Sequence, residues 1–328
     1  MTTRVEVLAS FVALLLAAMA AMALALMIGS VNLAPADVLA VIRGEGSSLA
    51  TTLVLELRWP RAVAAFATGG LLAMSGALMQ VLLRNPLADP YILGVSGGSA
   101  VGALLTLMLG LGFFWVSTAA FVGALVSILL VFTIAHGRGG WTPTRLLLTG
   151  VVVAAGWGAV ISLMLALGPD SSIRSMLFWL MGDLSYSQRP YQEFVVLLVG
   201  GLLVFPFSRH LNLLARGEMQ AKTLGVPARE LNIGIYLLAS IFTAVAVTEG
   251  GSIGFVGLVV PHMLRLVIGA DHRRLMPASM LAGGTLLVIA DTLARTVLAP
   301  RQLPVGVVTA FIGVPLFLYL LNRSRSQA

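Results

Sequence analysis

Gly94-Val95-Ser96-Gly97-Gly98 is the stretch whose residue types could support hydrolysis. It matches both the Gly-x-Ser-Gly string of intramembrane serine proteases and the Gly-x-Ser-x-Gly nucleophile elbow of hydrolases, but the elbow needs a strand-to-helix turn that a helical membrane segment does not supply. A protease would also need a histidine at the depth of Ser96. The only candidate, His262, lies near the far end of its own apolar run. Close helix packing through the glycines is the favoured interpretation.

Arginines are the second group with possible chemistry. Arg58-Trp59-Pro60-Arg61 lies at the mouth of an apolar run, where two guanidinium groups could dock an acidic partner, because the arginine fork matches a carboxylate bidentately. The alternative is anchoring of the helix at the lipid headgroups. Farther along the chain, Asp291 and Arg295 are four residues apart, so we expect them to pair on one helix face.

Composition shows what kind of elements must position these residues. The chain has 328 residues, of which 59% are hydrophobic and 10% charged, so it cannot be a soluble domain. We expect an all-α polytopic membrane protein forming a single transmembrane domain over 1–328. The absence of cysteine excludes disulfides and thiolate metal sites. The net charge of +7 is interpreted by position in the chain and does not indicate nucleic-acid binding.

Charged residues separate apolar runs long enough to cross a bilayer. Ten spans are expected, at 8–29, 62–83, two within 90–137 divided at 110–112, then 146–169, 191–208, 231–249, 253–268, 276–296 and 304–322. An even number of spans puts both termini on one side of the membrane.

The placement of arginine and lysine orients these spans. With a cytoplasmic N-terminus, the positive residues on the inner side are Arg4, Arg84, Arg138, Arg145, Arg209, Arg216, Lys222, Arg229, Arg265, Arg273, Arg274, Arg323 and Arg325. The smaller outer set is Arg43, Arg58, Arg61, Arg174, Arg189, Arg295 and Arg301. The excess on the inner side predicts that both termini are cytoplasmic.

Two inner connections have distinctive local chemistry. Arg84 to Pro90 is a polar turn with two prolines, and Asp89 before Pro90 predicts that a helix begins near Pro90, with Gly94, Gly98 and Gly102 on one packed face. The longest inner loop, about 209–229, reads as two short amphipathic helices split at Gly217 and stopped at Gly225 and Pro227. This loop either lies on the membrane surface or binds a cytoplasmic partner.

Seven motifs together resemble the FecCD family, the permease subunits of ABC importers for vitamin B12, ferric siderophores and haem. They are Arg58-Trp59-Pro60-Arg61, Arg84 to Pro90, Leu93 to Gly98, Trp179-Leu180-Met181-Gly182, Leu224-Gly225-Val226, Gly254 to Leu258 with Pro261-His262, and Leu303-Pro304-Val305-Gly306. The resemblance runs nearly end to end. It implies a type II importer permease in the bacterial inner membrane, forming a homodimer with two copies of an ABC ATPase and a periplasmic substrate-binding protein.

The resemblance also implies roles for particular residues. Binding-protein docking falls on Arg58, Arg61 and Arg295, and the cytoplasmic gate on Asn85, Leu87, Thr142 and Thr144. Pro143 departs from the small hydroxyl residue expected between the two threonines. Coupling to the ATPase is expected within the inner loop, at Gly217, Glu218, Gln220, Leu224 and Gly225.

Hydrolysis of ATP is expected elsewhere. No Gly-x-x-x-x-Gly-Lys-Ser/Thr string occurs and the only lysine is Lys222, so a separate ATPase must use the ATP and Mg²⁺ while this chain is no enzyme and binds no cofactor or metal. An ion-coupled secondary transporter is the rival class, and it would need ionisable groups near the midplane, where none is expected.

The cargo is harder to predict from these motifs. On this topology His136, His210 and His272 are cytoplasmic and His262 lies near the inner end, so no histidine faces the entrance. The pathway is therefore expected to pass a wrapped chelate without ligating it. Overall similarity favours haem, followed by a ferric siderophore and then cobalamin.

Overall fold

The computed structural model describes residues 4–136 and 142–325, and these contain helices but no strand, which confirms the all-α prediction. The α-helices in chain order are α1 (Arg4–Met27), α2 (Pro35–Ile42), α3 (Ser48–Thr51), α4 (Trp59–Leu82), α5 (Val95–Met108), α6 (Phe113–Ala135), α7 (Pro143–Leu167), α8 (Asp170–Leu180), α9 (Pro190–Val204), α10 (Ser208–Ala215), α11 (Glu218–Thr223), α12 (Ala228–Gly250), α13 (Val256–Ile268), α14 (His272–Thr296) and α15 (Val305–Arg325). Short π or 3-10 segments are η1 (Thr52–Arg58), η2 (Pro90–Leu93), η3 (Leu184–Tyr186) and η4 (Phe205–Phe207).

Ten of the described helical segments have the apolar character expected of membrane spans. Seven are long enough to cross a bilayer, and three shorter apolar helices, α5, α13 and the apolar part of α15, complete the set of ten. Each falls within a few residues of its predicted span. The short ones begin or end at Gly or Pro breaks, which is tolerated in membrane proteins where neighbouring helices cover the irregular backbone.

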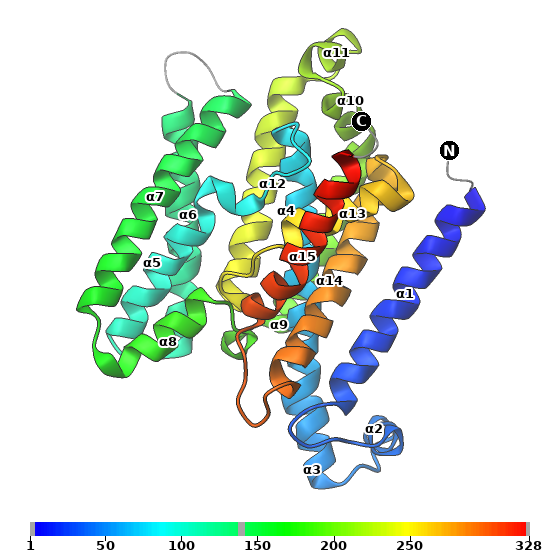
Figure 1. The fold of residues 1–328 in the computed structure, drawn as a ribbon, viewed down its shortest axis with the longest axis vertical. Helices are drawn as coiled ribbons and strands as arrows, with labels where there is room; N and C mark the ends of the chain where they lie inside the picture. The colour runs from blue at the N-terminus through cyan, green and yellow to red at the C-terminus, as the bar shows by residue number, and fades with distance from the viewer. Residues whose placement is uncertain (1–3, 137–141, 326–328) are drawn as a thin grey trace.

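The two ends of the bundle carry different elements (Figure 1). The start of α1, the last turns of α15, α10 and α11 lie at one end, here called the terminal end. The opposite end, here called the α2 end, carries α2, α3, α8 and the connection from α14 to α15. Arg138, assigned to the inner side by sequence, belongs to residues 137–141 and lies outside the described residues.

Helix α4 forms the core of the bundle. Every residue from 67 to 82 is buried, and α4 packs against α14, α12, α13 and α9. Small residues allow this close approach: a Cβ on Gly69 would lie 2.2 Å from the carbonyl oxygen of Gly283, and one on Gly76 would lie 1.8 Å from that of Gly257. Without a hydrophobic driving force between helices in lipid, such backbone proximity is what supplies packing energy.

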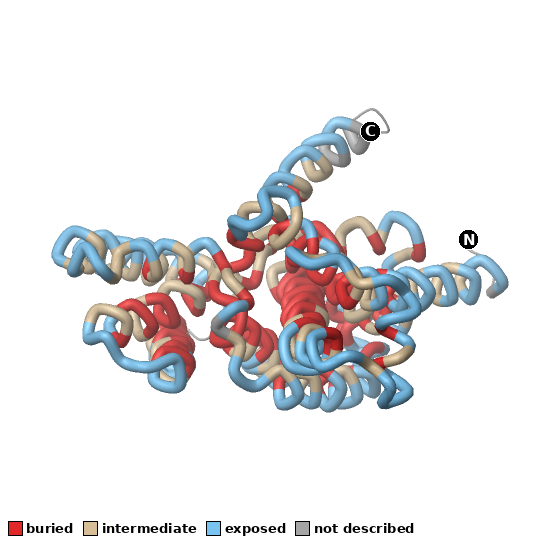
Figure 2. The backbone as a smooth tube through the Cα atoms, turned by 90° about the horizontal axis from the view of Figure 1, so that it is seen from below, coloured by how far each residue is buried: buried red, intermediate tan, exposed pale blue. Residues whose placement is uncertain are grey.

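Helices α5 to α8 form a second group beside this core (Figure 1). Gly98 and Gly102 lie against the backbone of α6, as the glycine strip predicted. Gly94 does not belong to the helix, because its φ of 70° is left-handed and it caps η2, so α5 begins at Val95 instead of near Pro90. In Figure 2 the buried residues form the interior of both groups, while α1 and α15 project outward, α1 with mostly exposed residues and α15 with a mixture of exposed and half-buried residues.

Candidate functional site

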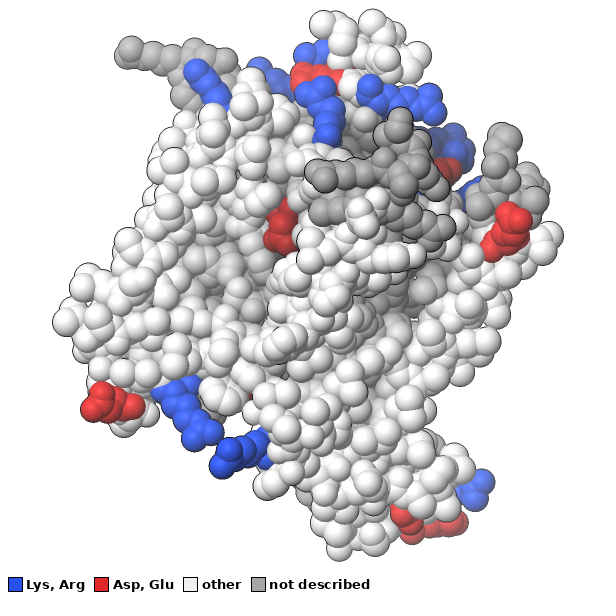
Figure 3. Space-filling view, viewed as in Figure 1, with Lys and Arg blue, Asp and Glu red and all other residues white. Residues whose placement is uncertain are grey.

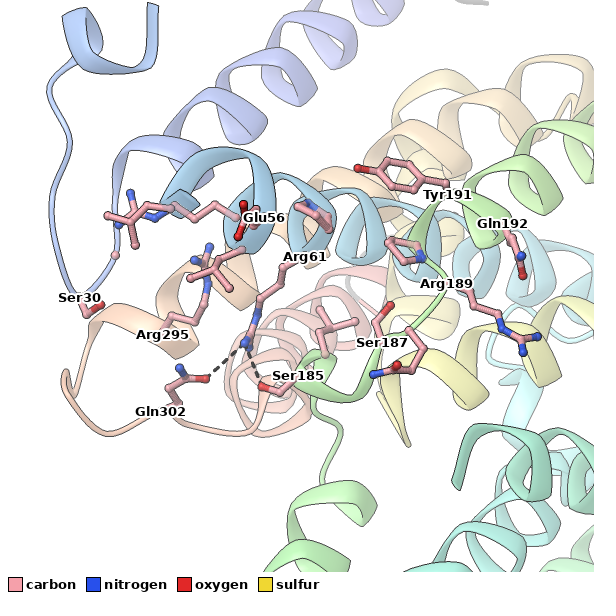
Figure 4. A pocket seen from close by; sticks show the side chains of 18 of the residues that line it. Ser30, Glu56, Arg61, Ser185, Ser187, Arg189, Tyr191, Gln192, Arg295 and Gln302 are labelled. Atoms are coloured by element: carbon pink, nitrogen blue, oxygen red, sulfur yellow. Dashed lines mark hydrogen bonds between the residues drawn. The ribbon is translucent and has the colours of Figure 1, made fainter. Parts of the chain in front are cut away.

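A hollow of about 810 Å³ opens at the α2 end of the bundle (Figure 4). Its lining comes from four separate parts of the chain and includes four arginines and one glutamate: Arg58, Arg61, Arg189, Arg295 and Glu56. Arg61 extends toward Gln302 and Ser185, Arg295 lies on the same side of the hollow, and the Arg189 side chain points away from them (Figure 4). The excess of guanidinium groups makes this hollow suited to acidic side chains.

Asp291 organises two of these arginines. Both of its carboxylate oxygens accept from Arg61, with Nε at 3.0 Å from each oxygen and Nη2 at 2.9 Å from Oδ1. Arg295 Nε lies 3.0 Å from Asp291 Oδ2, which confirms the predicted pair one helical turn apart. Arg61 Nη1 faces the opening of the hollow, where it donates to Ser185 Oγ and Gln302 Oε1 (Figure 4). Two arginines therefore share one buried carboxylate, and Asp183 Oδ1 lies 3.8 Å from Arg61 Nη2 as a second acidic neighbour.

Arg58 does not take the docking position predicted for it. Its side chain is only 4% exposed, and its guanidinium donates to the carbonyls of Leu26, Met27 and Val31. Leu26 and Met27 belong to the last turn of α1, whose carbonyl groups have no partner within the helix, and Val31 follows that turn. The guanidinium is occupied by these carbonyls and is not free for a partner, so the docking role predicted for Arg58 is corrected to a structural role at the end of α1.

Two further carboxyl groups are buried near the α2 end. Glu193, in the first turn of α9, accepts from Thr68 Oγ1 at 2.7 Å through Oε1, while its Oε2 has no partner among the described residues. Glu249, at the end of α12, accepts from Ser187 Oγ and from the backbone N–H groups of Gln188 and Arg189. Sequence analysis identified neither, because each forms its contacts across long chain separations.

Helices α10 and α11 form an exposed projection at the terminal end. Gly217 joins them with φ of 135°, a conformation that L side chains rarely adopt, and Gly225 ends the unit with φ of 79°. Leu224 is 65% exposed, and the Gln220 side chain is also on the surface. Glu218 pairs with Lys222 at 2.8 Å on the surface of α11. The predicted glycine-split helix pair is confirmed.

Figure 3 shows cationic side chains gathered at the terminal end of the molecule, around the region of α10 and α11. An exposed leucine surrounded by charge is the combination that a rigid helix presents to a groove on another protein. The apolar residues Leu211 and Leu214 on the inner face of α10 are buried, which fixes this projection to the bundle.

The residues predicted to form the gate lie in connections at the same end. Asn85 and Leu87 are exposed, and Asn85 Oδ1 accepts from Leu87 N at 2.9 Å, which shapes the turn after α4. Thr142 is the N-cap of α7 and accepts from Arg145 N at 3.3 Å, while Thr144 is exposed in the first turn. Thr142 therefore has a helix-capping role that the sequence motif did not predict.

Ser96, the residue that suggested protease chemistry, donates to Ser252 Oγ at 2.9 Å. His262 lies on α13 with its ring 6.3 Å from that of Phe317. The hydroxyl of Ser96 thus joins α5 to the connection before α13, which is a packing role.

A polar network at the terminal end was missed by sequence analysis. Asn212 on α10 contacts Asp271 and His272 at the start of α14, and Gln80 near the end of α4 contacts Arg265 on α13. Partial burial acts to raise the pKa of Asp271, but hydrogen bonds from Asn212 and Arg273 outweigh it and lower that pKa. Single polar residues at helix ends gave no sequence signal for these partners.

The sequence was compared with models of known protein families. A model of the FecCD transport family matches residues 14–323, nearly the whole chain. The chain belongs to the FecCD transport family. This membership confirms the resemblance inferred from the motifs and accounts for ten apolar helices without a nucleotide-binding motif.

Curated relatives of this FecCD chain have different names. It is 45% identical over 283 residues to the cobalamin import system permease protein BtuC of Halobacterium salinarum, covering 85% of this chain and 76% of that protein. It is 40% identical over 286 residues to the hemin transport system permease protein HmuU of Yersinia pestis, covering 83% of this chain and 84% of that protein. The two similarities are close enough that neither selects a cargo.

A solved structure has the same fold. The chain superposes with a TM-score of 0.83 and 30% identity on a protein described as a metal-chelate type ABC transporter in an inward-facing conformation, covering 95% of this chain and 98% of that chain. The polytopic importer architecture expected for the chain is therefore confirmed along its length.

Proposed function

We propose that this chain is the permease subunit of an ATP-driven ABC importer that moves haem across the bacterial inner membrane into the cytoplasm. The observation that carries the proposal is the full-length FecCD match on a bundle whose terminal end presents an exposed α10–α11 projection. A chain with this shape and no nucleotide motif needs a separate ATPase to drive it. The termini are then cytoplasmic, and the α2 end faces the periplasm.

Haem is proposed as the cargo on overall similarity, supported by the hemin permease of Yersinia pestis among the relatives. Within the described residues no group of three His, Asp or Glu side chains could hold a metal ion. A haem or chelate that arrives complexed needs no such ligands along the path. Cobalamin is the second candidate, because the relative named for cobalamin import is 45% identical.

Uptake by a reconstituted transporter tests this proposal. The permease is placed in liposomes with its ATPase and binding protein, and haem, a ferric siderophore and cobalamin are offered separately. ATP-dependent accumulation of haem supports the proposal. Accumulation of only one of the other two retains the importer and replaces the cargo.

The hollow at the α2 end is proposed as the docking surface for a periplasmic binding protein. The lining supports this role because it carries four arginines against one glutamate, and Asp291 holds Arg61 and Arg295 in place. Acidic residues on the two lobes of the partner would complement this charge, and would steer its approach. Arg58 is excluded from the docking set by its burial under α1.

The projection of α10 and α11 is proposed as the element that an ABC ATPase binds. Gly217, Glu218, Gln220, Leu224 and Gly225 shape or cover its outer surface. The ATPase can shift the permease only through contacts that differ between its own two states. A projection held rigidly by buried Leu211 and Leu214 is suited to receive such a displacement.

A homodimer completes the proposed transporter, with the path between two copies of the chain. Asn85 and Leu87 after α4, together with Thr142 and Thr144 before α7, are proposed as its cytoplasmic gate. Their exposure at the terminal end supports this role, since a gate must move without disturbing the core. The surrounding lipid contacts the exposed apolar faces of the spans.

A further inference from the structure

A cluster of hydrogen bonds joins α10 to the start of α14. Asn212 Nδ2 donates to Asp271 Oδ1 at 2.7 Å, and His272 N donates to Asn212 Oδ1 at 2.8 Å. The same Oδ1 lies 2.6 Å from His272 Nδ1. One amide side chain thus uses both its donor and its acceptor on two consecutive residues of another helix.

This cluster lies at the N-cap of α14 and therefore contacts the residue at which that helix begins. Asp271 caps that helix by accepting from Arg273 N at 3.1 Å, and its carbonyl accepts from Arg274 N and Leu275 N. Asn212 therefore contacts the group that begins α14. A displacement of Asn212 acts directly on the position of the first turn of that helix.

Apolar contacts alone would not fix this position. Leu211 and Leu214 hold α10 against the bundle, but apolar contact is non-directional and allows one helix to slide past another. Hydrogen bonds weaken steeply when their distance or angle changes. The bonds of Asn212 consequently set the register between α10 and α14.

A second cluster joins α13, which packs against α14, to the end of α4 near the gate. Arg265 Nη2 on α13 donates to Gln80 Oε1 at 3.1 Å, and Gln80 Nε2 donates to the carbonyl of Leu258 at 3.2 Å. The carbonyl of Gln80 accepts from Asn85 N at 3.2 Å. Gln80 is only 2% exposed, so these bonds are shielded from competing water.

We infer that Asn212 is a positioning residue for transport: through Asp271 and His272 it transmits displacement of the α10–α11 projection to the α13–α14 hairpin, whose Arg265 bears on Gln80 and the turn holding Asn85. This inference rests on the proposed coupling role of α10 and α11. It adds a defined contact through which motion of that projection reaches the gate.

Exchanging the amide and the carboxylate between positions 212 and 271 tests the inference in the assembled transporter with its ATPase. Asn212→Asp sets two carboxylates against each other, so haem taken up per ATP hydrolysed should fall about tenfold while the ATPase stays bound. Adding Asp271→Asn to this variant restores a donor facing a carboxylate, and Asn still caps α14. The ratio of uptake to hydrolysis should then return to within about twofold of wild type.

Two controls keep the result interpretable. Asn32→Asp adds the same charge at the α2 end, where Asn32 is exposed and accepts from Gly29 N, and it should leave the ratio unchanged. Asn212→Ala breaks the cluster without adding charge and serves if Asn212→Asp does not assemble. Its uptake per ATP should also fall, with ATPase retention unchanged.

Three outcomes overturn the inference. The first is an unchanged uptake ratio in Asn212→Ala, and the second is failure of the exchanged pair to recover. The third is loss of thermal stability and of bound ATPase in proportion to uptake, which is the result of a merely structural role. Leu224→Glu separates this inference from the proposed function on which it rests. If both Leu224→Glu and the Asn212 variants keep uptake coupled to ATP hydrolysis, the proposed role of α10 and α11 is wrong. If Leu224→Glu uncouples the two and the Asn212 variants do not, only the role of Asn212 is wrong.

Discussion

Asp89 shows how a single residue links sequence chemistry to pH. It is the N-cap of η2, where its carboxylate accepts from Tyr91 N at 2.8 Å, and burial raises its pKa to about 6. A carboxyl whose pKa is higher in the folded than in the unfolded protein binds its proton more tightly when folded. Stability therefore falls as pH rises between about 4 and 6 and stays lower above that range.

Replacing Asp89 with asparagine should remove this dependence. Asparagine keeps the capping acceptor but carries no charge, so Asp89→Asn should be about 1–2 kcal/mol more stable than wild type above pH 6 and similar to it near pH 4. Thermal unfolding in detergent across this range measures the difference. Asp37→Asn is the control, because Asp37 caps α2 through Ala34 N but is exposed. An equal gain at both positions would contradict the explanation by burial.

Arg61 carries the docking prediction. Arg61→Glu should weaken binding of a haem-loaded periplasmic binding protein about tenfold at low salt, and less at high salt where surface charges are screened. Arg43→Glu, on the connection after α2 at the same end, is the matched control and should bind normally. Binding by the two variants is compared by titration in nanodiscs, with thermal unfolding to check the Arg61–Asp291 contact. Equal binding by both variants would assign Arg61 to structure alone.

At the scale of the element, the α10–α11 projection can be tested with a single substitution. Leu224→Glu replaces an apolar side chain that is 65% exposed, so the permease should stay folded while the ATPase dissociates or hydrolyses ATP without transport. Ile42→Glu is the matched control, since Ile42 is 68% exposed at the end of α2 and lies at the other end of the bundle. Co-purification of ATPase and uptake per ATP are the measurements. Full coupling in Leu224→Glu would show that the projection has no such role.

Features that depend on residues close together in the sequence were predicted correctly. Apolar length predicted the ten apolar helices, of which seven are long enough to cross a bilayer, glycine and proline predicted the α10–α11 pair, and the spacing of Asp291 and Arg295 predicted their contact. These features depend on neighbours within one or two turns. The contacts of Arg58 with α1 and of Asn212 with α14 depend on how distant segments pack, so no local pattern could indicate them.

The same distinction explains the errors in detail. Asp89-Pro90 did start a helical turn, but Gly94 adopted a left-handed conformation and divided it from α5. Arg58 had the residue type for docking, yet the end of α1 lies beside it and offers carbonyls that have no partner within the helix. In both cases the chemistry of the residue was interpreted correctly, but its role depends on a segment distant in sequence that packs beside it.

At the scale of the whole molecule, the proposed homodimer places two gates against each other. The chain lacks cysteine, so single cysteines introduced as Asn85→Cys and Thr144→Cys react without background. Crosslinks between copies should form at these positions and change in yield when ATP binds, because a gate has different separations in its two states. Gly44→Cys, on the connection after α2, is a control at the other end. Crosslinks that never form or ignore nucleotide would contradict the gate assignment.

Haem uptake driven by ATP is the property on which the proposed function depends most directly. Proteoliposomes containing the permease, its ATPase and its binding protein should accumulate haem when ATP is supplied on the side of α10 and α11, and not with a non-hydrolysable analogue. Accumulation driven by a proton or sodium gradient without ATP would contradict the assignment as an ABC importer permease, as would failure to move haem, ferric siderophore or cobalamin in a complex that hydrolyses ATP.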